Sequence, residues 1–285
     1  MPVVLACLAS LCFGAGLVTA KFGLRLVDAR AGAAMSVPTA AVFFVAVSLV
    51  WLDVAALDWR AVAVFALVGL FFPAAVTIIN FVSADRIGPA LTSSVSGTSP
   101  LFGIVAALAV LGEPIPARAL LATIGIVAGV ALMSWGRTAL GAPRLGWLLC
   151  LPVAAAAIRG LSQVFAKLGL AMWPSPLAAS LVGYLVSASV LLIADRARSG
   201  RRAGRPPRRA VVLFVATGLL NGIGLMMTYV ALQNAPVALV APIVAAFPVL
   251  TLALTVALVR DEPIGRRTVL GAALTLAAVM YLVAG

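Results

Sequence analysis

The stretch "LGEPIPARALLATIG" (residues 111–125) decides the fold, because the chain contains it twice. "RDEPIGRRTVLGAAL" (residues 260–274) places the same acidic-proline turn between two apolar runs. Glu262 follows Glu113 by 149 residues, and both copies continue with Pro-Ile and then with Arg and Leu at matched spacings. The repetition predicts that the chain is built from two related halves.

A second match supports the repeat. "GAGLVTAKFGL" (residues 14–24) corresponds to "GLSQVFAKLGL" (residues 160–170), with Lys21 opposite Lys167 and glycines conserved in place between the copies. The separation is again close to half of the chain. Two independent matches at nearly one spacing indicate duplication of the whole unit.

The amino-acid composition indicates that the chain lies in a membrane. Of 285 residues, 64% are hydrophobic and 10% are charged, whereas a soluble domain carries roughly 25% charged residues. The apolar residues form runs of about twenty, the length that an α-helix needs to cross a bilayer core. No alternating ten-residue segments of a membrane barrel occur. We therefore predict an all-α integral membrane protein with ten transmembrane helices, approximately at residues 2–24, 32–52, 60–82, 89–111, 118–137, 145–168, 176–194, 210–232, 236–258 and 267–285.

The ten runs divide evenly between the copies. Residues 1–140 hold the first five-helix repeat, and residues 141–285 hold the second, which includes a basic loop at residues 195–209. Because five is an odd number, the second copy enters the membrane from the opposite side. The result is an inverted repeat, an arrangement typical of secondary transporters.

Several classes of site are excluded by residue counts. The chain has no histidine, and its three cysteines all lie in apolar runs, so we predict no metal, no disulfide framework and no cofactor. The net charge of +12 comes mainly from loops beside the membrane spans. We therefore interpret the basic residues as a signal of orientation in the membrane and not of nucleic-acid binding.

Two five-helix copies, each with Lys-x-Gly-Leu near the end of its first helix and a Glu-Pro-Ile turn before its last, resemble the EamA family of the drug/metabolite transporter superfamily. The resemblance covers essentially the whole chain. It implies a ten-helix transporter, frequently an exporter, with a central cavity lined by the first, third and fourth helices of each half. We interpret the Glu-Pro turn as structural, because proline and an acidic residue both favour a helix start.

A polar stripe runs along the sixth span. Arg159 lies 14 residues, or about 21 Å, into that span, and Gln163 and Lys167 follow at helical spacing. One interpretation is that the stripe faces a substrate. The alternative is that Arg159 bonds the carbonyls of a helix broken near Pro152 and that Lys167 anchors the membrane boundary. Lys21 is the repeat partner of Lys167, although its own stripe continues with apolar residues.

Other polar groups occur on spans that the family uses for its cavity. Ser96 and Ser99 share one face of the fourth span, and Asn80 and Asn221 lie on the third and eighth. Hydroxyl groups in membranes also join helices without binding a ligand. The predicted substrate-binding residues are Arg159, Gln163, Lys167, Asn80, Asn221, Ser96, Ser99 and Lys21.

These features predict a secondary transporter that works by alternating access and exports a small polar metabolite, such as an amino acid or another zwitterionic or anionic compound. All eight acidic residues fall at or beyond predicted helix ends, which disfavours exchange of cations for protons at a buried carboxylate. No catalytic residues are predicted. The alternatives are a membrane enzyme acting on lipid-linked substrates, which would need convergent acids or histidines, and a non-transporting scaffold.

The expected partners are the substrate and membrane lipid, with no nucleic acid. Gly125-x-x-x-Gly129 permits close helix contact, which we interpret as packing within one chain; the protein itself is a monomer or a homodimer.

The distribution of basic residues predicts the orientation. With both termini outside, the cytosolic loops hold 16 Lys and Arg residues and the outer loops hold two. The positive-inside rule therefore predicts external termini and a cytosolic loop at residues 195–209, in the inner membrane. The family resemblance implies the opposite, with both termini in the cytosol.

Overall fold

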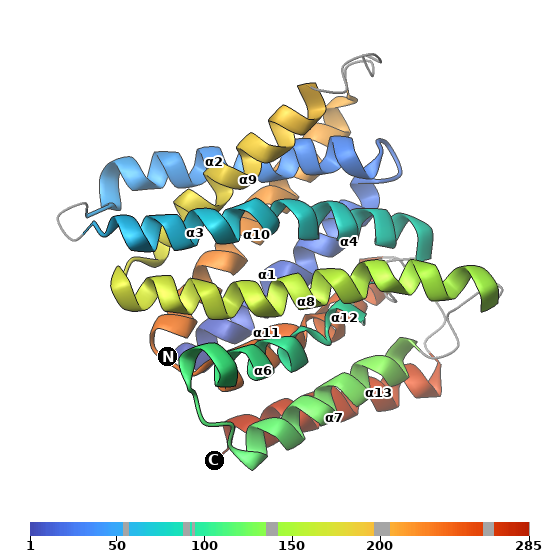
Figure 1. Cartoon of the computed structure of the whole chain (residues 1–285). Coiled ribbons are helices and arrows are strands. Elements are labelled where there is room, and N and C mark those ends of the chain that lie inside the picture. The colour runs from blue at the N-terminus through green and yellow to red at the C-terminus, as the bar shows by residue number, and fades with distance from the viewer. Residues whose placement is uncertain are drawn as a thin grey trace.

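The computed structural model describes residues 1–53, 57–87, 92, 95–134, 142–196, 206–258 and 265–284. Over these residues the chain is helical, with no strand (Figure 1). Its helices are α1 (Pro2–Gly23), α2 (Ala29–Trp51), α3 (Trp59–Phe71), α4 (Ala74–Ile87), α6 (Ser99–Leu111), α7 (Ala117–Ser134), α8 (Ala142–Met172), α9 (Pro176–Arg196), α10 (Arg208–Gln233), α11 (Val237–Ala245), α12 (Phe247–Leu258) and α13 (Arg266–Val283). Glu262, with its Pro-Ile turn, and most of the basic loop lie outside the described residues.

The predicted class, an all-α multi-pass membrane protein, is confirmed. Eight helical segments of the described chain are long and apolar enough to cross a membrane, when α3 and α4 are counted together as Trp59–Ile87 and α11 is joined to α12 as Val237–Leu254. Two shorter apolar helices, α6 and α7, fall within the predicted fourth and fifth spans. Bilayer thickness fixes the length of an apolar run, which explains why most helix ends agree with the predicted ends.

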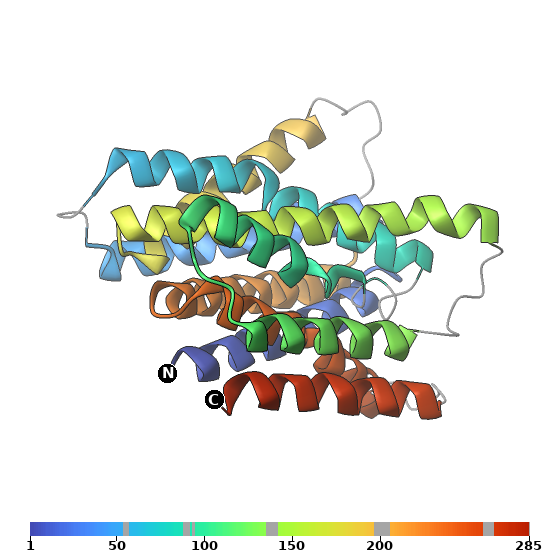
Figure 2. The ribbon, with the colours of Figure 1, turned by 60° about the horizontal axis from the view of Figure 1, so that its bottom comes forward.

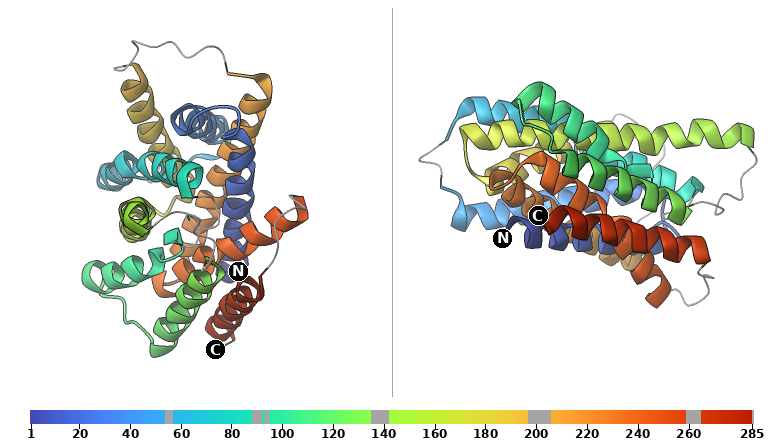
Figure 3. Two further views of the ribbon diagram at one scale, coloured as in Figure 1. Left: turned by 90° about the vertical axis from the view of Figure 1, so that its right-hand side faces the viewer. Right: turned by 90° about the horizontal axis from the view of Figure 1, so that it is seen from below.

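The helices of the two halves interleave. α1 packs on α10, α2 and α3 pack on α9, and α6 packs on α8, so each contact joins an early helix to a late one. The two chain ends lie close together at one end of the bundle (Figure 1). α7 and α13 form a pair at the edge of the bundle, as Figures 2 and 3 show from two directions.

Glycine makes the contact between α7 and α13 possible. A Cβ atom at Gly129 would overlap the side chain of Thr275 and lie 2.6 Å from the carbonyl oxygen of Gly271. Gly125 similarly faces Ala278. The prediction that the Gly125-x-x-x-Gly129 pattern packs within the chain is confirmed.

The third span is broken, which the sequence analysis did not predict. α3 ends at Phe71 and α4 begins at Ala74, with the Phe72–Pro73 peptide between them in the cis form. Proline has no backbone N–H, so the carbonyl of Gly69 loses the donor that a continuous helix would supply. Within a membrane such a group needs another partner.

Ser187 on α9 supplies that partner. Its Oγ donates a hydrogen bond of 2.6 Å to the Gly69 carbonyl and accepts one of 3.2 Å from the Ala74 N–H. The side chain is fully buried. One serine thus satisfies backbone groups on both sides of the break, and it fixes where α4 begins.

The Glu113 turn has a structural contact, as predicted, but with a different helix from the expected one. α7 begins at Ala117, three residues after Pro114, so Pro114 does not lie in the first turn of that helix. The Glu113 carboxylate instead accepts a hydrogen bond of 2.9 Å from the N–H of Val237, the first residue of α11. Glu113 therefore caps a helix of the other half.

Candidate functional site

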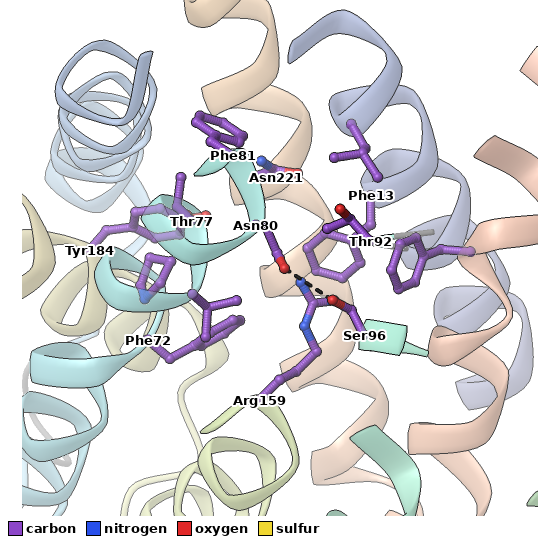
Figure 4. Close-up of a pocket in the computed structure, with 14 residues that line it drawn as sticks. Phe13, Phe72, Thr77, Asn80, Phe81, Thr92, Ser96, Arg159, Tyr184 and Asn221 are labelled. Carbon is purple, nitrogen blue, oxygen red and sulfur yellow. Dashed lines mark hydrogen bonds between the residues drawn. The ribbon is translucent and has the colours of Figure 1, made fainter. Parts of the chain in front are cut away.

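A polar pocket lies inside the bundle where helices of both halves meet. Its empty volume, counting its open mouth, is about 580 Å³. Figure 4 shows it, with the sticks converging from several helices. The lining residues are Phe13, Leu17, Phe72, Pro73, Val76, Thr77, Asn80, Phe81, Thr92, Ser96, Arg159, Tyr184, Asn221 and Phe247.

Arg159 is the charged residue of this lining. It lies 17 residues after the start of α8, or about 26 Å along the helix, and is only 8% exposed. α8 runs unbroken through Pro152, so the structure does not show the broken helix that the alternative interpretation of Arg159 required. The Nε atom of Arg159 is buried without a hydrogen-bond partner in the described part of the chain.

Three aromatic rings surround the Arg159 guanidinium. Its central carbon lies 5.0 Å from the ring centre of Phe13, 5.7 Å from that of Phe72 and 5.4 Å from that of Phe247. The face of an aromatic ring attracts a cation, by about 2 kcal/mol when the pair is desolvated. This aromatic cage stabilises the charge and leaves guanidinium N–H groups as donors for a ligand.

Neutral polar groups complete the pocket. Ser96 Oγ donates a hydrogen bond of 3.0 Å to Asn80 Oδ1, and Figure 4 shows this pair beside the guanidinium. Thr77 lies one turn before Asn80 on α4, and Asn221 reaches the pocket from α10. Amide and hydroxyl groups at these positions offer both donors and acceptors.

Helix ends meet at the wall of the pocket. Pro73 lies between the C-terminus of α3 and the N-terminus of α4, and Phe247 begins α12 directly after the end of α11. The N-terminus of a helix favours negative charge, and broken transmembrane helices use it to hold anionic groups. None of the described residues that line the pocket is acidic. The Arg159 guanidinium could thus donate charge-assisted hydrogen bonds to an anionic group.

Four of the eight predicted residues meet in this pocket: Arg159, Asn80, Asn221 and Ser96. The other four are placed outside its lining. Gln163 is 5% exposed and its Oε1 has no partner in the described chain, whereas Ser99 is buried at the start of α6. Lys21 lies in the last turn of α1, and Lys167 forms an ion pair with Glu113.

The aromatic part of the site was not predicted from the sequence. Phe13, Phe72 and Phe247 each stand in an apolar run, where a phenylalanine that faces a cation looks like one that faces lipid. Tyr184 on α9 also stands in an apolar run. Its buried hydroxyl needs a polar neighbour, which is a partial signal that it faces the pocket. A search for aromatic residues at the depth of Arg159 could have found the cage.

Fold and pocket together define a multi-pass α-helical membrane protein built around a buried polar site. A family model described as "EamA-like transporter family" matches residues 1–135 and matches again over residues 146–284. The chain belongs to this family, as its turn motifs predicted. The family is one of DMT-type membrane transporters.

Comparison with solved structures agrees with the fold. One structure, titled "Crystal structure of protein", superposes with a TM-score of 0.80 at 17% sequence identity and covers 98% of this chain and 94% of its own. At this identity the likeness concerns the fold alone. None of the curated proteins matches the chain.

Proposed function

We propose that the protein is a secondary transporter that exports a small polar metabolite with an anionic group, such as an amino acid or another carboxylate, through the Arg159 pocket. One observation carries this proposal: a buried guanidinium lies in a pocket whose described lining offers it no acid. Charge-assisted hydrogen bonds to a carboxylate or phosphate would complete its coordination.

The burial of Arg159 has an energetic cost that must be offset. An arginine near the bilayer centre costs from about 2.5 kcal/mol to more than 10 kcal/mol, depending on the method of measurement. The aromatic cage offsets part of this cost. A purely structural arginine would be expected to hold backbone carbonyls or an acid, whereas Arg159 retains a buried Nε without a partner.

Alternating access of two inverted five-helix halves is the proposed mechanism. The two segments matched by the family model, and the pairing of early with late helices, support this architecture. With α6 and α7 counted as crossings, the eight longer spans become ten. An even number of crossings places both termini on one side of the membrane.

The test compares two variants of Arg159. Arg159→Lys keeps the charge but loses the planar fork, so substrate flux in proteoliposomes should fall by about tenfold. In the Arg159→Gln variant, substrate flux should fall by about a hundredfold or more, while the melting temperature stays close to that of the unchanged protein. The substrate is first found by a thermal-shift screen of amino acids and small carboxylates, because a ligand that binds the folded state raises its melting temperature.

A stable Gln variant with unchanged flux would remove Arg159 from the site. A Gln variant that loses stability by the same amount with and without substrate would show that Arg159 is structural.

We further propose an inner-membrane location with both termini outside and the loop at residues 195–209 in the cytosol. The 16 to 2 distribution of basic residues supports this orientation. In a background without native cysteines, a Ser199→Cys variant should resist an impermeant thiol reagent in intact spheroplasts and react after lysis. Reaction in intact spheroplasts would reverse the orientation.

A further inference from the structure

A second polar cluster joins the two halves at the end of the bundle where α6 and α8 end and α11 begins. Lys167 Nζ lies 2.5 Å from Glu113 Oε1 and donates a hydrogen bond of 2.7 Å to the Ala235 carbonyl. Glu113 Oε2 accepts the hydrogen bond of the Val237 N–H. Each charged group therefore has two partners, and Glu113 belongs to the first half while the other three residues belong to the second.

The cluster lies beyond one end of the pocket. Lys167 follows Arg159 by eight residues, or about 12 Å, along α8. α11 leads from Val237 at the cluster to Phe247 in the aromatic cage, and α6 leads from Ser99, close to the pocket, to Glu113. On α4, in contrast, the pocket lining runs from Pro73 to Phe81, towards the helix end that carries Arg86. The cage and the cluster thus lie at one end of the pocket.

Close backbone packing between α6 and α8 lies nearer to the pocket. A Cβ atom at Gly160 would lie 2.5 Å from the Ser99 carbonyl oxygen and 2.7 Å from the Gly103 nitrogen. These helices therefore touch tightly at their pocket ends. Towards the ends of α6 and α8 that are farther from the pocket, the polar cluster joins the two helices.

We propose that the Glu113–Lys167 ion pair, seated on the N-terminus of α11, is a gate that closes the pocket towards the membrane face carrying the α6–α7 turn. The inference rests on the proposed alternating access. The physical reason is reversibility: the two side chains are 16% and 22% exposed, so water can replace each partner when the halves separate. If the pair forms in only one of two conformations, its loss shifts the equilibrium towards the other conformation.

The test measures access to the pocket from each side of the membrane. Cys7, Cys12 and Cys150 are replaced by alanine, and Leu17→Cys supplies a reporter thiol in the pocket lining. The protein is reconstituted in vesicles of known orientation and treated with an impermeant thiol reagent. With Glu113 and Lys167 intact, labelling from the gated face should be slow compared with labelling from the opposite face.

Two variants open the gate. Glu113→Gln removes the charge but keeps an acceptor for the Val237 N–H, and it should raise the labelling rate from the gated face by about tenfold. Lys167→Met keeps the length of the side chain and should raise the labelling rate at least as much. Arg118→Gln is the matched control, because Arg118 lies at the same end but binds the carbonyls of Tyr281 and Leu282 at the end of α13. It should leave the labelling rate unchanged.

If the Glu113→Gln variant is labelled from the gated face at the wild-type rate, the ion pair is not a gate and only holds the two halves together. If Lys167→Met fails to fold, Glu113→Gln alone decides, because its helix cap is retained. The experiment needs no substrate, so it is separable from the proposed function: Arg159 variants with unchanged flux reject the pocket as the transport site, whereas unchanged labelling rejects the gate.

Discussion

The third spans of the two halves have the same place in the proposed repeat but different structures. In the first half this span is broken into α3 and α4, and it brings Pro73, Thr77 and Asn80 to the pocket. In the second half it is α10, an unbroken helix of 26 residues that contributes only Asn221 to the described lining. The difference indicates that the third span of the first half supplies several pocket groups, whereas the third span of the second half mainly packs against its neighbours.

Glycines make this packing of α10 possible. Gly23 and Gly32 both face the ring of Phe214 on α10, and a Cβ atom at either would overlap that ring. Gly218 on α10 lies directly against the Ser36 carbonyl of α2. α10 therefore packs closely against α1 and α2 through glycines, whereas the α3–α4 break is supported by hydrogen bonds.

Gly218→Val should have the largest effect. Its Cβ would overlap the backbone carbonyl of Ser36, which cannot move like a side chain, so the free energy of unfolding should fall by about 3 kcal/mol or more. The measurement is the yield and melting temperature of the protein in detergent. Gly183→Ala is the control, because nothing lies within 4 Å of its added Cβ, and its melting temperature should not fall. A Gly218→Val variant of normal stability would show that α10 is less closely packed than its contacts imply.

Ser187→Ala should have the next largest effect, because it removes the hydrogen bonds that support the α3–α4 break. It leaves the Gly69 carbonyl and the Ala74 N–H buried without the serine hydroxyl, at a cost of about 1–3 kcal/mol. Both the melting temperature and the flux should fall, because α4 carries much of the pocket. Ser189→Ala on the same helix removes only a bond to the carbonyl of Leu185 and should change neither quantity. Equal effects of the two substitutions would mean that the break needs no support from α9.

A matched pair of substitutions compares the two spans directly. Thr77→Val on α4 removes a hydroxyl from the pocket lining, so flux should fall by about two- to tenfold. Thr228→Val on α10 removes a hydroxyl that bonds the Gly224 carbonyl of its own helix, so flux should be unchanged. Both variants keep the size of the side chain. A flux loss in Thr228→Val alone would reverse the assignment of the two spans.

Asp58→Ala should have the smallest effect on stability and none on flux. The Asp58 carboxylate caps the N-terminus of α3, far from the break, by accepting a hydrogen bond of 2.7 Å from the Arg60 N–H. Loss of such a cap costs about 1 kcal/mol. The melting temperature should fall by a few degrees while the rate of transport stays constant. A change in flux would show that the N-terminus of α3, and not only the break, controls the pocket.

Features that depend on a local run of residues could be predicted from the sequence, whereas features that depend on contacts between distant residues could not. The helix of Pro2–Gly23 was predicted to within one residue, because bilayer thickness limits an apolar run. The break at Pro73 was not predicted, since proline in an apolar run also fits a kinked continuous helix. Its support, Ser187, lies 113 residues from Ala74 in the chain, and no local pattern connects them.

The same reasoning applies to the polar site. Arg159 could be identified because a charge deep in the membrane is costly wherever it points. Lys167 was predicted to share its role, since helical spacing places both on one stripe. The structure pairs Lys167 with Glu113 of the other half, and spacing within one helix contains no information about such a partner. Whether Gln163, Ser99 and Lys21 contact a substrate in another conformation stays a prediction.

The contact between α7 and α13 has a consequence for biogenesis. α7 leaves the ribosome roughly 130 residues before its main neighbour, a delay on the order of 10 s at ordinary rates of translation. During that interval the glycine face of α7 meets lipid instead of the backbone of Gly271 and the side chain of Thr275. Insertion of the final helix is therefore the event that completes the edge of the bundle, and a nascent chain released without α13 would display an unpaired helix face to the quality-control proteases of the membrane.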